Sequence, residues 1–466
     1  MKEKRYRRSP QSQSSRTANR EQKSHREEKQ FCESIRPLFR RFLVIGFFIF
    51  LVLATLWFLG SPAYFTNHLA SKAVSRLDAF AAEYWLGWSN SFAPDHADTR
   101  LIQARIARRR GDLAEMEEHL RVARRTANRE RRVTRERMLA EAQQGKLTAI
   151  EPQLNQWLFE QNPDAAEICD AYVNGLFVAS RLEMAERVLD AWQSDFPQDP
   201  RPYYRRGRLY QHFDRLADAE GAFRNAIMLK PDYYSALYNL GRVLNEQKRS
   251  TDAIPIYEAC MQMPNPLAVR VAKAQALVAT GKTDAAEELL RDVLRADVKE
   301  IIDSYRSVDD TPELFTAASE LGNLLLNAGI YDEAFDLLQT ALDFNSRDTN
   351  ARYSRAMALR GLGKIDESEQ ELQVVQAARE KLAKVNQLRN LINRDPNNTE
   401  ARLELGELLF RYESQRNGLF WLRSVFSYDP DCQRTKDKIA ELIAQTLDNG
   451  SPINATTTGS GPPSGK

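Results

Sequence analysis

The clearest pattern in the chain is a fixed spacing of small and large apolar positions. Counting from Gly207, Ala219 lies at position +12, Phe223 at +16, Ala226 at +19 and Pro231 at +24. Similar series recur, and most of them start 33 to 35 residues after the one before. Their first positions are Ala70, Ala104, Leu139, Val173, Gly207, Gly241, Ala274, Gly322, Ala356 and Gly406. A period of this length is typical of proteins built from stacked supersecondary units.

Each repeat predicts two antiparallel helices. We expect the small residue of the first helix to face the small residue 12 positions later, and the large residue at +16 to fill the gap between neighbouring hairpins. Glycine in the turn, as at Gly281 and Gly329, ends the first helix. Proline ends the second helix because it has no N–H to donate. Since each hairpin leaves an apolar face that only the next hairpin covers, the pattern predicts an all-α solenoid of about ten helical hairpins.

Two segments match the repeated spacing closely: ALYNLGRVLNEQKRSTDAIPIYEACMQMPN (236–265) and AASELGNLLLNAGIYDEAFDLLQTALDFN (317–345). They resemble the tetratricopeptide repeat (TPR), and the resemblance covers about residues 63–432. It implies a right-handed α-solenoid that binds proteins or peptides. Two positions depart from the family pattern. Arg206 replaces a large apolar residue, and Pro255 lies early in a second helix, which we expect it to perturb.

Two repeats are longer than the others, by 14 and 16 residues relative to a period of 34. The first excess lies near residues 300–312 and is polar, which predicts a loop or an extra short helix. The second lies near residues 377–393 and predicts a second helix lengthened by about four turns. Its apolar residues have helical spacing and are Leu382, Val385, Leu388 and Leu391. This apolar stripe would either dock a partner or pack back on the solenoid.

Residues 42–59 read FLVIGFFIFLVLATLWFL, 18 positions without a charge. Such a run is long enough to span a bilayer as a helix. Three arginines precede it closely, whereas Lys72 and Arg76 are the only basic residues among the 20 that follow, and basic residues are enriched on the cytoplasmic side. We therefore expect a single transmembrane helix, with the N-terminus in the cytoplasm and residues 60–466 outside. The alternative is a cleaved signal peptide, although its apolar core is normally about 7–15 residues long.

The overall composition hides an asymmetry of charge. The 466 residues are 42% hydrophobic and 28% charged, with a net charge of +2, which excludes a uniformly basic nucleic-acid binder. Residues 1–41 nevertheless carry 13 Lys and Arg against 5 Asp and Glu, a net charge of +8, and their polar composition predicts a disordered cytoplasmic tail. At the other end, residues 433–447 are amphipathic and predict a capping helix. Residues 448–466 are rich in Gly, Ser, Thr and Pro and predict a disordered tail.

The sequence offers little material for catalysis or metal binding. It contains 4 Cys and 5 His, and the three cysteines after the apolar segment (Cys169, Cys260 and Cys432) are not at metal-ligand spacing. We find no Gly-rich phosphate loop, nucleophile elbow or paired-His motif. We therefore expect buried or half-buried thiols, no cofactor, no metal, no nucleic-acid partner and no enzymatic activity.

Ligands of TPR proteins usually lie along the concave surface formed by the first helices, and the resemblance places positions −3, −2 and +1 of each repeat on that surface. In two neighbouring repeats, these positions and one further turn hold Tyr204, Arg205, Arg208, Tyr238, Asn239, Arg242 and Asn245. Arginine binds carboxylates through two parallel hydrogen bonds, and tyrosine offers rigid contact area. We expect this groove to bind an extended peptide with an acidic residue or a C-terminal carboxylate. The alternative is that these residues pair with Asp and Glu of neighbouring repeats.

A second basic feature is the run 105–137, which has 12 Arg against 6 Asp and Glu. It belongs to the second and third repeats and is therefore expected near the bilayer, where it would contact anionic head groups or another membrane protein. The alternative is a solvated helix face with ion pairs inside one helix, such as Glu136 with Arg132.

Together these patterns predict a single-pass protein of the cell (inner) membrane that displays an α-solenoid on the extracytoplasmic side. Its expected function is protein–protein interaction, in the assembly or tethering of an envelope or secretory complex. The alternatives are a secreted soluble solenoid, after cleavage of the apolar segment, and a regulatory subunit of an envelope enzyme. Neither the partner nor the oligomeric state follows from the sequence.

Overall fold

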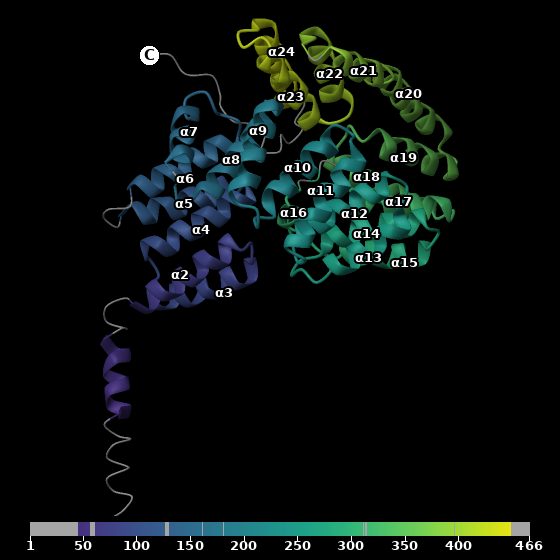
Figure 1. Ribbon diagram of the computed structural model, residues 1–466. Coiled ribbons are helices and arrows are strands. Elements are labelled where there is room, and N and C mark those ends of the chain that lie inside the picture. Colours follow the sequence, from purple (N-terminus) through teal and green to yellow (C-terminus); the bar gives the residue numbers. More distant parts are fainter. Residues whose placement is uncertain are drawn as a thin grey trace, which may run out of the picture. The chain divides into compact units, whose positions relative to one another are not determined.

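The computed structural model describes residues 45–55, 61–125, 130–160, 162–179, 181–310, 312, 315–395 and 397–448. In this part of the chain, every regular element is a helix, and contacts divide the chain into two compact units, Met1–Gln103 and Ala104–Lys466 (Figure 1). The helices that follow residues 45–55 are α2 (Ser61–Ser75), α3 (Ala79–Phe92), α4 (Ala97–Arg110), α5 (Leu113–Arg125), α6 (Glu130–Gln143), α7 (Glu151–Phe159), α8 (Ala165–Val178), α9 (Leu182–Asp195), α10 (Arg201–His212), α11 (Leu216–Leu229), α12 (Tyr234–Glu246), α13 (Ser250–Cys260), α14 (Leu267–Ala279), α15 (Thr283–Val293), α16 (Val298–Ser307), α17 (Thr316–Asn327), α18 (Tyr331–Phe344), α19 (Thr349–Gly361), α20 (Ile365–Leu382), α21 (Val385–Arg394), α22 (Thr399–Tyr412), α23 (Gln415–Ser424), the 3₁₀ turn η1 (Val425–Ser427) and α24 (Gln433–Asp448).

The ten starting positions of the repeats each fall on a different helix, from Ala70 on α2 to Gly406 on α22. A second helix follows each of these helices, and pairs such as α10 with α11, α12 with α13 and α17 with α18 pack against each other. Within Ala104–Lys466, successive hairpins also pack together, as α11 does on α12 and α18 on α19. The predicted all-α solenoid of helical hairpins is therefore confirmed for the described residues.

In hairpins that start with glycine, the large residue at +16 contacts that glycine. A methyl group at Gly207 would lie 2.6 Å from Cε1 of Phe223, and one at Gly241 would lie 2.4 Å from Cε1 of Tyr257. The large residue at +16 therefore packs directly on the glycine of its own hairpin, and Phe223 and Tyr257 also belong to the buried cluster that includes neighbouring hairpins. Glycine is needed at these starting positions because an aromatic ring occupies the space of its missing side chain.

The turns inside several hairpins share a backbone conformation. Gly281 and Gly329 have φ values of +79° and +77°, which a residue without a Cβ adopts at little cost. After α14, the N–H groups of Gly281 and Lys282 bond the carbonyls of Val278 and Leu277, which closes the end of the helix. The prediction that glycine in the turn ends the first helix is confirmed.

The two departures from the family pattern are accommodated locally. Helix α13 continues through Pro255, although it has 11 residues where α11 has 14. The guanidinium of Arg206 donates to the Oδ1 of Asp190 (2.6 Å) and the Oε1 of Gln193 (2.7 Å) on the neighbouring hairpin. An ion pair and a hydrogen bond thus replace the usual apolar contact.

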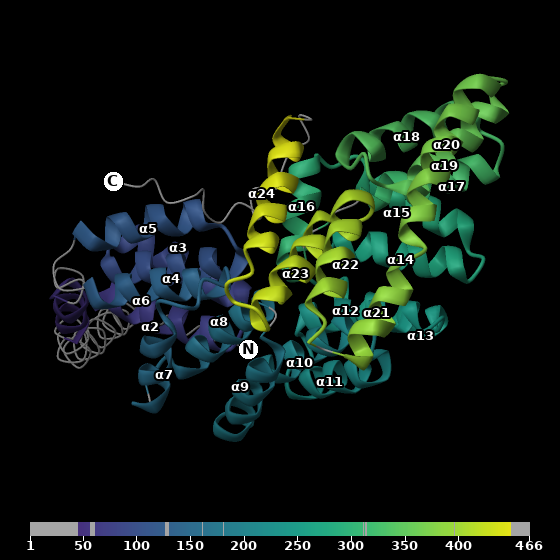
Figure 2. The ribbon, with the colours of Figure 1, turned by 90° about the horizontal axis from the view of Figure 1, so that it is seen from above.

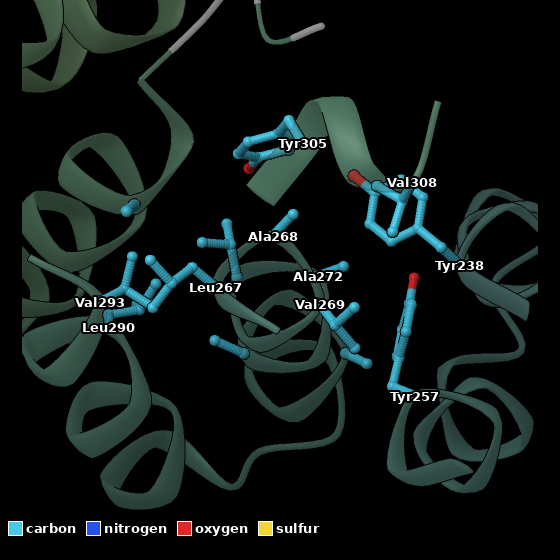
Figure 3. Packing of buried hydrophobic residues seen from close by; sticks show 14 of the residues in the cluster. Tyr238, Tyr257, Leu267, Ala268, Val269, Ala272, Leu290, Val293, Tyr305 and Val308 are labelled. Carbon is cyan, nitrogen blue, oxygen red and sulfur yellow. The ribbon is translucent and has the colours of Figure 1, made fainter. Parts of the chain in front are cut away.

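The first insertion forms helix α16, which lies on the concave side of the curve made by α10, α12 and α14 (Figure 2). Figure 3 shows Tyr305 and Val308 of this segment facing Ala268 and Ala272 of α14, with Tyr238 of α12 beside them. These five residues belong to the largest buried apolar cluster of the described chain. The insertion is therefore packed into the inner surface of the solenoid.

The second insertion is not the continuous helix that we predicted. Helix α20 ends at Leu382, and a separate helix, α21, begins at Val385. Val385, Leu388 and Ile392 are buried against α22, whereas Leu391 is exposed. The apolar stripe thus packs back on the solenoid and is not a free docking surface.

The last helices return toward earlier hairpins. On α24, Ile439 and Leu442 pack against residues of α22 and α23. The ring of Phe420 on α23 lies 4.0 Å from the ring of His212 on α10 and 5.6 Å from that of Phe177 on α8, measured between centroids. Unit Ala104–Lys466 therefore closes on itself through an aromatic contact.

The N-terminal apolar segment is described only in part. Residues 45–55 form a helix whose phenylalanines are exposed, including Phe47, Phe48 and Phe50. No helix among the described residues is long and apolar enough to cross a bilayer. The ends of the predicted span, 42–44 and 56–59, lie outside the described residues, as do the two tails predicted to be disordered, apart from residue 448.

An exposed aromatic stripe follows this segment in unit Met1–Gln103. Phe80, Tyr84 and Trp88 lie at four-residue intervals on α3 and are 74%, 52% and 47% exposed. Trp88 stacks on Phe92, with ring centroids 5.9 Å apart. Because residues four apart share one face of a helix, the stripe runs along one side of α3.

Candidate functional site

The predicted groove residues lie on α10 and α12, two successive first helices. Tyr204 and Tyr238 are buried, and the amide nitrogen of Asn239 donates to the carbonyl of Ser235 (2.8 Å) and approaches the Tyr204 hydroxyl (3.5 Å). On the last turn of α12, Asn245 donates to the hydroxyl of Tyr257 (3.3 Å). The structure therefore brings the side chains of both helices to one surface.

Asp309, which follows α16, occupies the α10 part of this surface. Its Oδ2 accepts hydrogen bonds from Nη1 of Arg205 (2.7 Å) and from the hydroxyl of Tyr204 (3.1 Å). Its backbone carbonyl accepts from Nη1 of Arg208 (2.7 Å). Three of the predicted groove residues thus hold one acidic residue of the same chain.

Asp310 occupies the α12 part in the same way. Its Oδ2 accepts from Nη1 of Arg242 (3.0 Å) and from the hydroxyl of Tyr238 (3.2 Å). The side chain of Asp310 is 15% exposed, whereas that of Asp309 is 39% exposed. The groove therefore engages two consecutive carboxylates, and the more exposed of them lies against α10.

The turn after α16 aims both carboxylates at the groove. The N–H of Asp309 bonds the carbonyl of Arg306 (3.1 Å), and that of Asp310 bonds the carbonyl of Tyr305 (3.0 Å). Asp309 has a φ of +57°, the left-handed conformation of a common helix ending, which Asp and Asn adopt more readily than most residues. This ending places the side chains of Asp309 and Asp310 beyond the end of α16, where they contact α10 and α12.

Arg205 also pairs with the preceding hairpin, as the alternative expectation proposed. Its Nε donates to Oδ1 of Asp170 on α8 (2.7 Å). Burial disfavours the charged forms of Arg205 and of Asp170. The attraction of Asp170 and Asp309 nevertheless leaves the pKa of Arg205 well above its ordinary value. In the same way, Arg205 and Arg201 hold the pKa of Asp170 below its usual range. Arg205 is thus partly structural, whereas Arg208 and Arg242 point to the insertion.

Two amide oxygens of the groove have no donor in the described structure. They are Oδ1 of Asn239, a residue without exposed surface, and Oδ1 of Asn245. A buried acceptor that gave up water without gaining a donor costs about 1–3 kcal/mol. The form with α16 bound therefore leaves hydrogen-bonding capacity unused.

A small cavity of about 70 Å³ opens beside Asp309. Its walls combine the guanidinium groups of Arg205 and Arg208 with the polar side chain of Asn174 and with apolar residues of α8, α9 and α10. Asn174 is the residue after the starting position Val173, so this cavity continues the concave surface into the preceding repeat. The groove has room next to the carboxylate that it holds.

Part of the arginine-rich run forms a buried ion network that the sequence did not predict. Other arginines of the run form ion pairs on solvated faces, as the alternative expectation proposed, such as Arg121 with Glu118 inside α5. Glu136 of α6 accepts from Nε of Arg105 (2.9 Å) and from Nε of Arg108 (2.9 Å) of α4. Glu167 of α8 accepts from Nη2 of Arg108 (3.0 Å) and from Arg109. Arg108 has no exposed side-chain surface, so it lies neither at a lipid surface nor on a solvated face.

This network corrects the expected pairing of Glu136. Glu136 pairs with arginines of α4, not with Arg132 of its own helix. Burial alone would raise the pKa of Glu136 and Glu167, but the surrounding arginines hold both pKa values below the ordinary range. Arginines spaced three and four residues apart on α4, with a glutamate in each of the next two first helices, were the only signal in the sequence.

The remaining candidate groups show no sign of special reactivity. Cys169 and Cys260 are buried and Cys432 is half-buried, as predicted, and all three thiols are free. Burial raises the pKa of Cys169 and of Cys260 to about 12. Across the described residues, no cluster of His, Cys, Asp and Glu could hold a metal ion.

The described residues define a helical-repeat fold, and comparison with known families agrees. Family models described as tetratricopeptide repeat match residues 204–260, 244–304 and 320–383. These segments therefore carry tetratricopeptide repeats, and they include helix α12 and most of helix α10. A second-helix tyrosine of these segments, Tyr257, packs on Gly241, as described above.

Solved structures with a similar helical-repeat fold have low sequence identity to this chain. PilW, a type IV pilus biogenesis factor, is 17% identical over 46% of this chain and 93% of its own, with a TM-score of 0.39. The pilF protein of Pseudomonas aeruginosa is 14% identical over 52% and 95%, with a TM-score of 0.28. The APC/C hetero-tetramer Cut9–Hcn1 is 12% identical over 74% and 63%, with a TM-score of 0.41. No curated protein matches the sequence. The likeness concerns the fold alone and carries no argument about function.

Proposed function

We propose that this protein is a membrane-anchored interaction scaffold whose concave face on α10 and α12 binds an acidic segment of a partner protein. The observation that carries this proposal is the convergence of three arginines and two tyrosine hydroxyls on two consecutive aspartates. Donors from two rigid helices recognise carboxylates with defined geometry, and arginine does so more selectively than lysine.

The same donors would suit a C-terminal carboxylate, which also offers two acceptor oxygens on one carbon. Arg208 and Arg242 are the best candidates for recognition, because neither pairs with a buried acid of the solenoid core. The cavity beside Asn174 would receive a neighbouring side chain of the partner. The proposed ligand is therefore an extended acidic segment that runs across the repeats of α8, α10 and α12.

In-cell photo-crosslinking tests this function. A photoreactive residue at position 174 of the full chain should trap a partner segment that contains acidic residues, as identified by mass spectrometry. The double variant Arg208→Glu/Arg242→Glu should lose this crosslink. The matched control is Arg224→Glu/Arg249→Glu, since these arginines pair with Glu220 on the outer helices, half-exposed to solvent. Recovery of the same crosslinked segment from both variants would contradict groove binding.

We also propose that residues 42–59 anchor the chain in the cell (inner) membrane with the N-terminus in the cytoplasm, and that the partner belongs to an envelope or secretory assembly. The apolar run and the charge difference across it support this orientation. The exposed aromatic stripe of α3 agrees, because Trp and Tyr are enriched where a membrane protein leaves the bilayer.

Membrane extraction distinguishes the anchor from the secreted alternative. An anchored chain stays in the pellet after washing with alkaline carbonate and retains the peptides of residues 1–41. Protease added to the outside of spheroplasts should digest residues 60–466 and spare the tail. Release of a chain that lacks the first 59 residues would show that the segment is a cleaved signal peptide. The regulatory-subunit alternative is decided by the identity of the crosslinked partner, which would then be an enzyme.

A further inference from the structure

Helix α16 is an addition to the solenoid rather than one of its stacking units. It lies between α15 and α17, in the repeat that is 14 residues longer than the common period. Helices α15 and α17 nevertheless pack directly against each other, and α14 also contacts α17. The hairpins therefore stack continuously without α16, and α16 is not needed for this stacking.

Helix α16 and the residues after it contact the inner surface of the solenoid through both polar and apolar groups. Ser304 on α16 accepts from the N–H of Ala268 (2.9 Å) and donates to the carbonyl of Asn265 (2.8 Å). Tyr305 and Val308 pack on the inner face of α14 (Figure 3). Together with the ion pairs of the two aspartates, this arrangement combines apolar anchors with paired charges, as peptide complexes do.

With α16 in the groove, two buried hydrogen-bond acceptors of α12 lack donors among the described residues. Oδ1 of Asn239 and Oδ1 of Asn245 lack donors in the described structure, although both lie on the groove helix α12. An extended peptide carries one backbone N–H per residue and could donate to them, whereas α16 uses its N–H groups within the helix. Asp309 also remains 39% exposed, so its contact with Arg205 is open to competing carboxylates.

We propose that the segment from α16 to Asp310 is an internal ligand that closes the groove and is displaced when an acidic segment of a partner binds. This proposal rests on the proposed function of the groove. The chain's own sequence Val308-Asp309-Asp310 then shows which chemistry the groove accepts: an apolar residue followed by two adjacent carboxylates. Because the partner binds only molecules whose groove is open, its apparent affinity equals its intrinsic affinity multiplied by the open fraction. A segment bound about 99% of the time lowers the apparent affinity about 100-fold.

A peptide with the sequence of residues 298–312, labelled with a fluorophore, serves as a probe in trans. It is titrated into the detergent-solubilised full chain, either wild type or with Asp309→Asn/Asp310→Asn. Asparagine keeps the size of the side chain and tolerates the left-handed backbone at position 309, so the variant keeps the turn while losing both charges. We expect the peptide to bind the variant at least about tenfold more tightly than the wild type, because the internal competitor is weakened.

Hydrogen exchange supplies a second readout. In the wild type, the amides of α16 should exchange faster than those of α12 and α14, and addition of the probe peptide should accelerate exchange in α16 alone. Circular dichroism checks that the variant retains its helices. A probe peptide with Asn at both acidic positions controls for non-specific binding.

The possible outcomes separate the two proposals. If the peptide binds neither form of the chain, the groove does not accept acidic segments, and the proposed function fails together with the inference. If the peptide binds both forms equally, or if α16 stays protected while the peptide is bound, the groove binds ligands but the insertion does not control it. Tighter binding to the variant, with α16 released, supports both.

Discussion

Glu167→Gln tests how much the buried ion network contributes to stability. The carboxylate of Glu167 is 7% exposed and accepts hydrogen bonds from Arg108 (3.0 Å), Arg109 (3.1 Å) and Arg201. Glutamine keeps the shape of the side chain but leaves three arginines around a neutral group. Removal of one partner from a buried ion pair typically destabilises a protein by about 3–5 kcal/mol. Because Glu136 continues to neutralise Arg108, we expect the lower end, about 3 kcal/mol.

The assay must be local, because a repeat solenoid does not unfold in one step. Hydrogen exchange of the α6 and α8 amides reports the free energy of opening of this region. A loss of about 3 kcal/mol corresponds to exchange roughly 150-fold faster, since every 1.4 kcal/mol is about a factor of ten. The control is Glu118→Gln, which removes an exposed pair with Arg121, worth about 0–1 kcal/mol.

The contribution of Glu167 to stability decreases as the pH falls. The arginines depress the pKa of Glu167 in the folded chain, so its contribution is complete at neutral pH and is lost as the pH falls from the unfolded pKa, about 4.3, through the folded value. Glu167→Gln should therefore be less acid-sensitive than the wild type. An exchange rate within about fivefold of that of the Glu118→Gln control would refute the network's role in stability.

Three further predictions concern packing, burial and protonation. Gly241→Ala places a methyl group within 2.4 Å of a tyrosine ring and should lower the free energy of opening of α12 and α13 by about 1–3 kcal/mol, as measured by hydrogen exchange. Gly87→Ala, whose methyl group meets no atom within 4 Å, should leave exchange in α3 unchanged. Burial raises the pKa of Cys169 and of Cys260 to about 12, so both thiols should resist iodoacetamide at pH 8 until urea unfolds the chain. Equal labelling rates before and after unfolding would contradict the burial of these thiols. Burial, with smaller effects of nearby arginines, lowers the pKa of His212 to about 4, so its stabilising contribution is complete above pH 6.5 and is lost as the pH falls toward 4. His212→Leu should remove this loss, and an unchanged pH profile of hydrogen exchange in α10 would argue against it.

Periodic features of the fold were predictable because they depend on neighbours within about 35 residues. The starting residues of the repeats, the turn glycines and the surface shared by Tyr204 and Tyr238 all follow from helical spacing and from the TPR resemblance. The expectation of carboxylate recognition at the groove also came from the sequence, through its arginines.

Long-range contacts were not predictable in this way. Nothing near Asp309 and Asp310 indicates that they return to helices about 70 and 100 residues earlier, because their partners depend on the curvature of the whole solenoid. The break between α20 and α21 was missed since Ala383 and Lys384 are ordinary helix formers. The arginine network was missed because its acids lie one and two repeats away from α4.

The most direct test of the central claim is a double-mutant cycle between the groove and its ligand. In the Asp309→Asn/Asp310→Asn chain, Arg208 and Arg242 are replaced by glutamine, and the 298–312 peptide is used with its two aspartates either intact or changed to asparagine. Arg242 contacts the carboxylate of Asp310 directly, whereas Arg208 contacts the backbone carbonyl of Asp309. The carboxylate contact of Arg242 therefore predicts a coupling energy of at least about 1 kcal/mol in the four binding affinities. A coupling energy of zero, with the peptide still bound, would show that Arg242 does not recognise a carboxylate of the ligand.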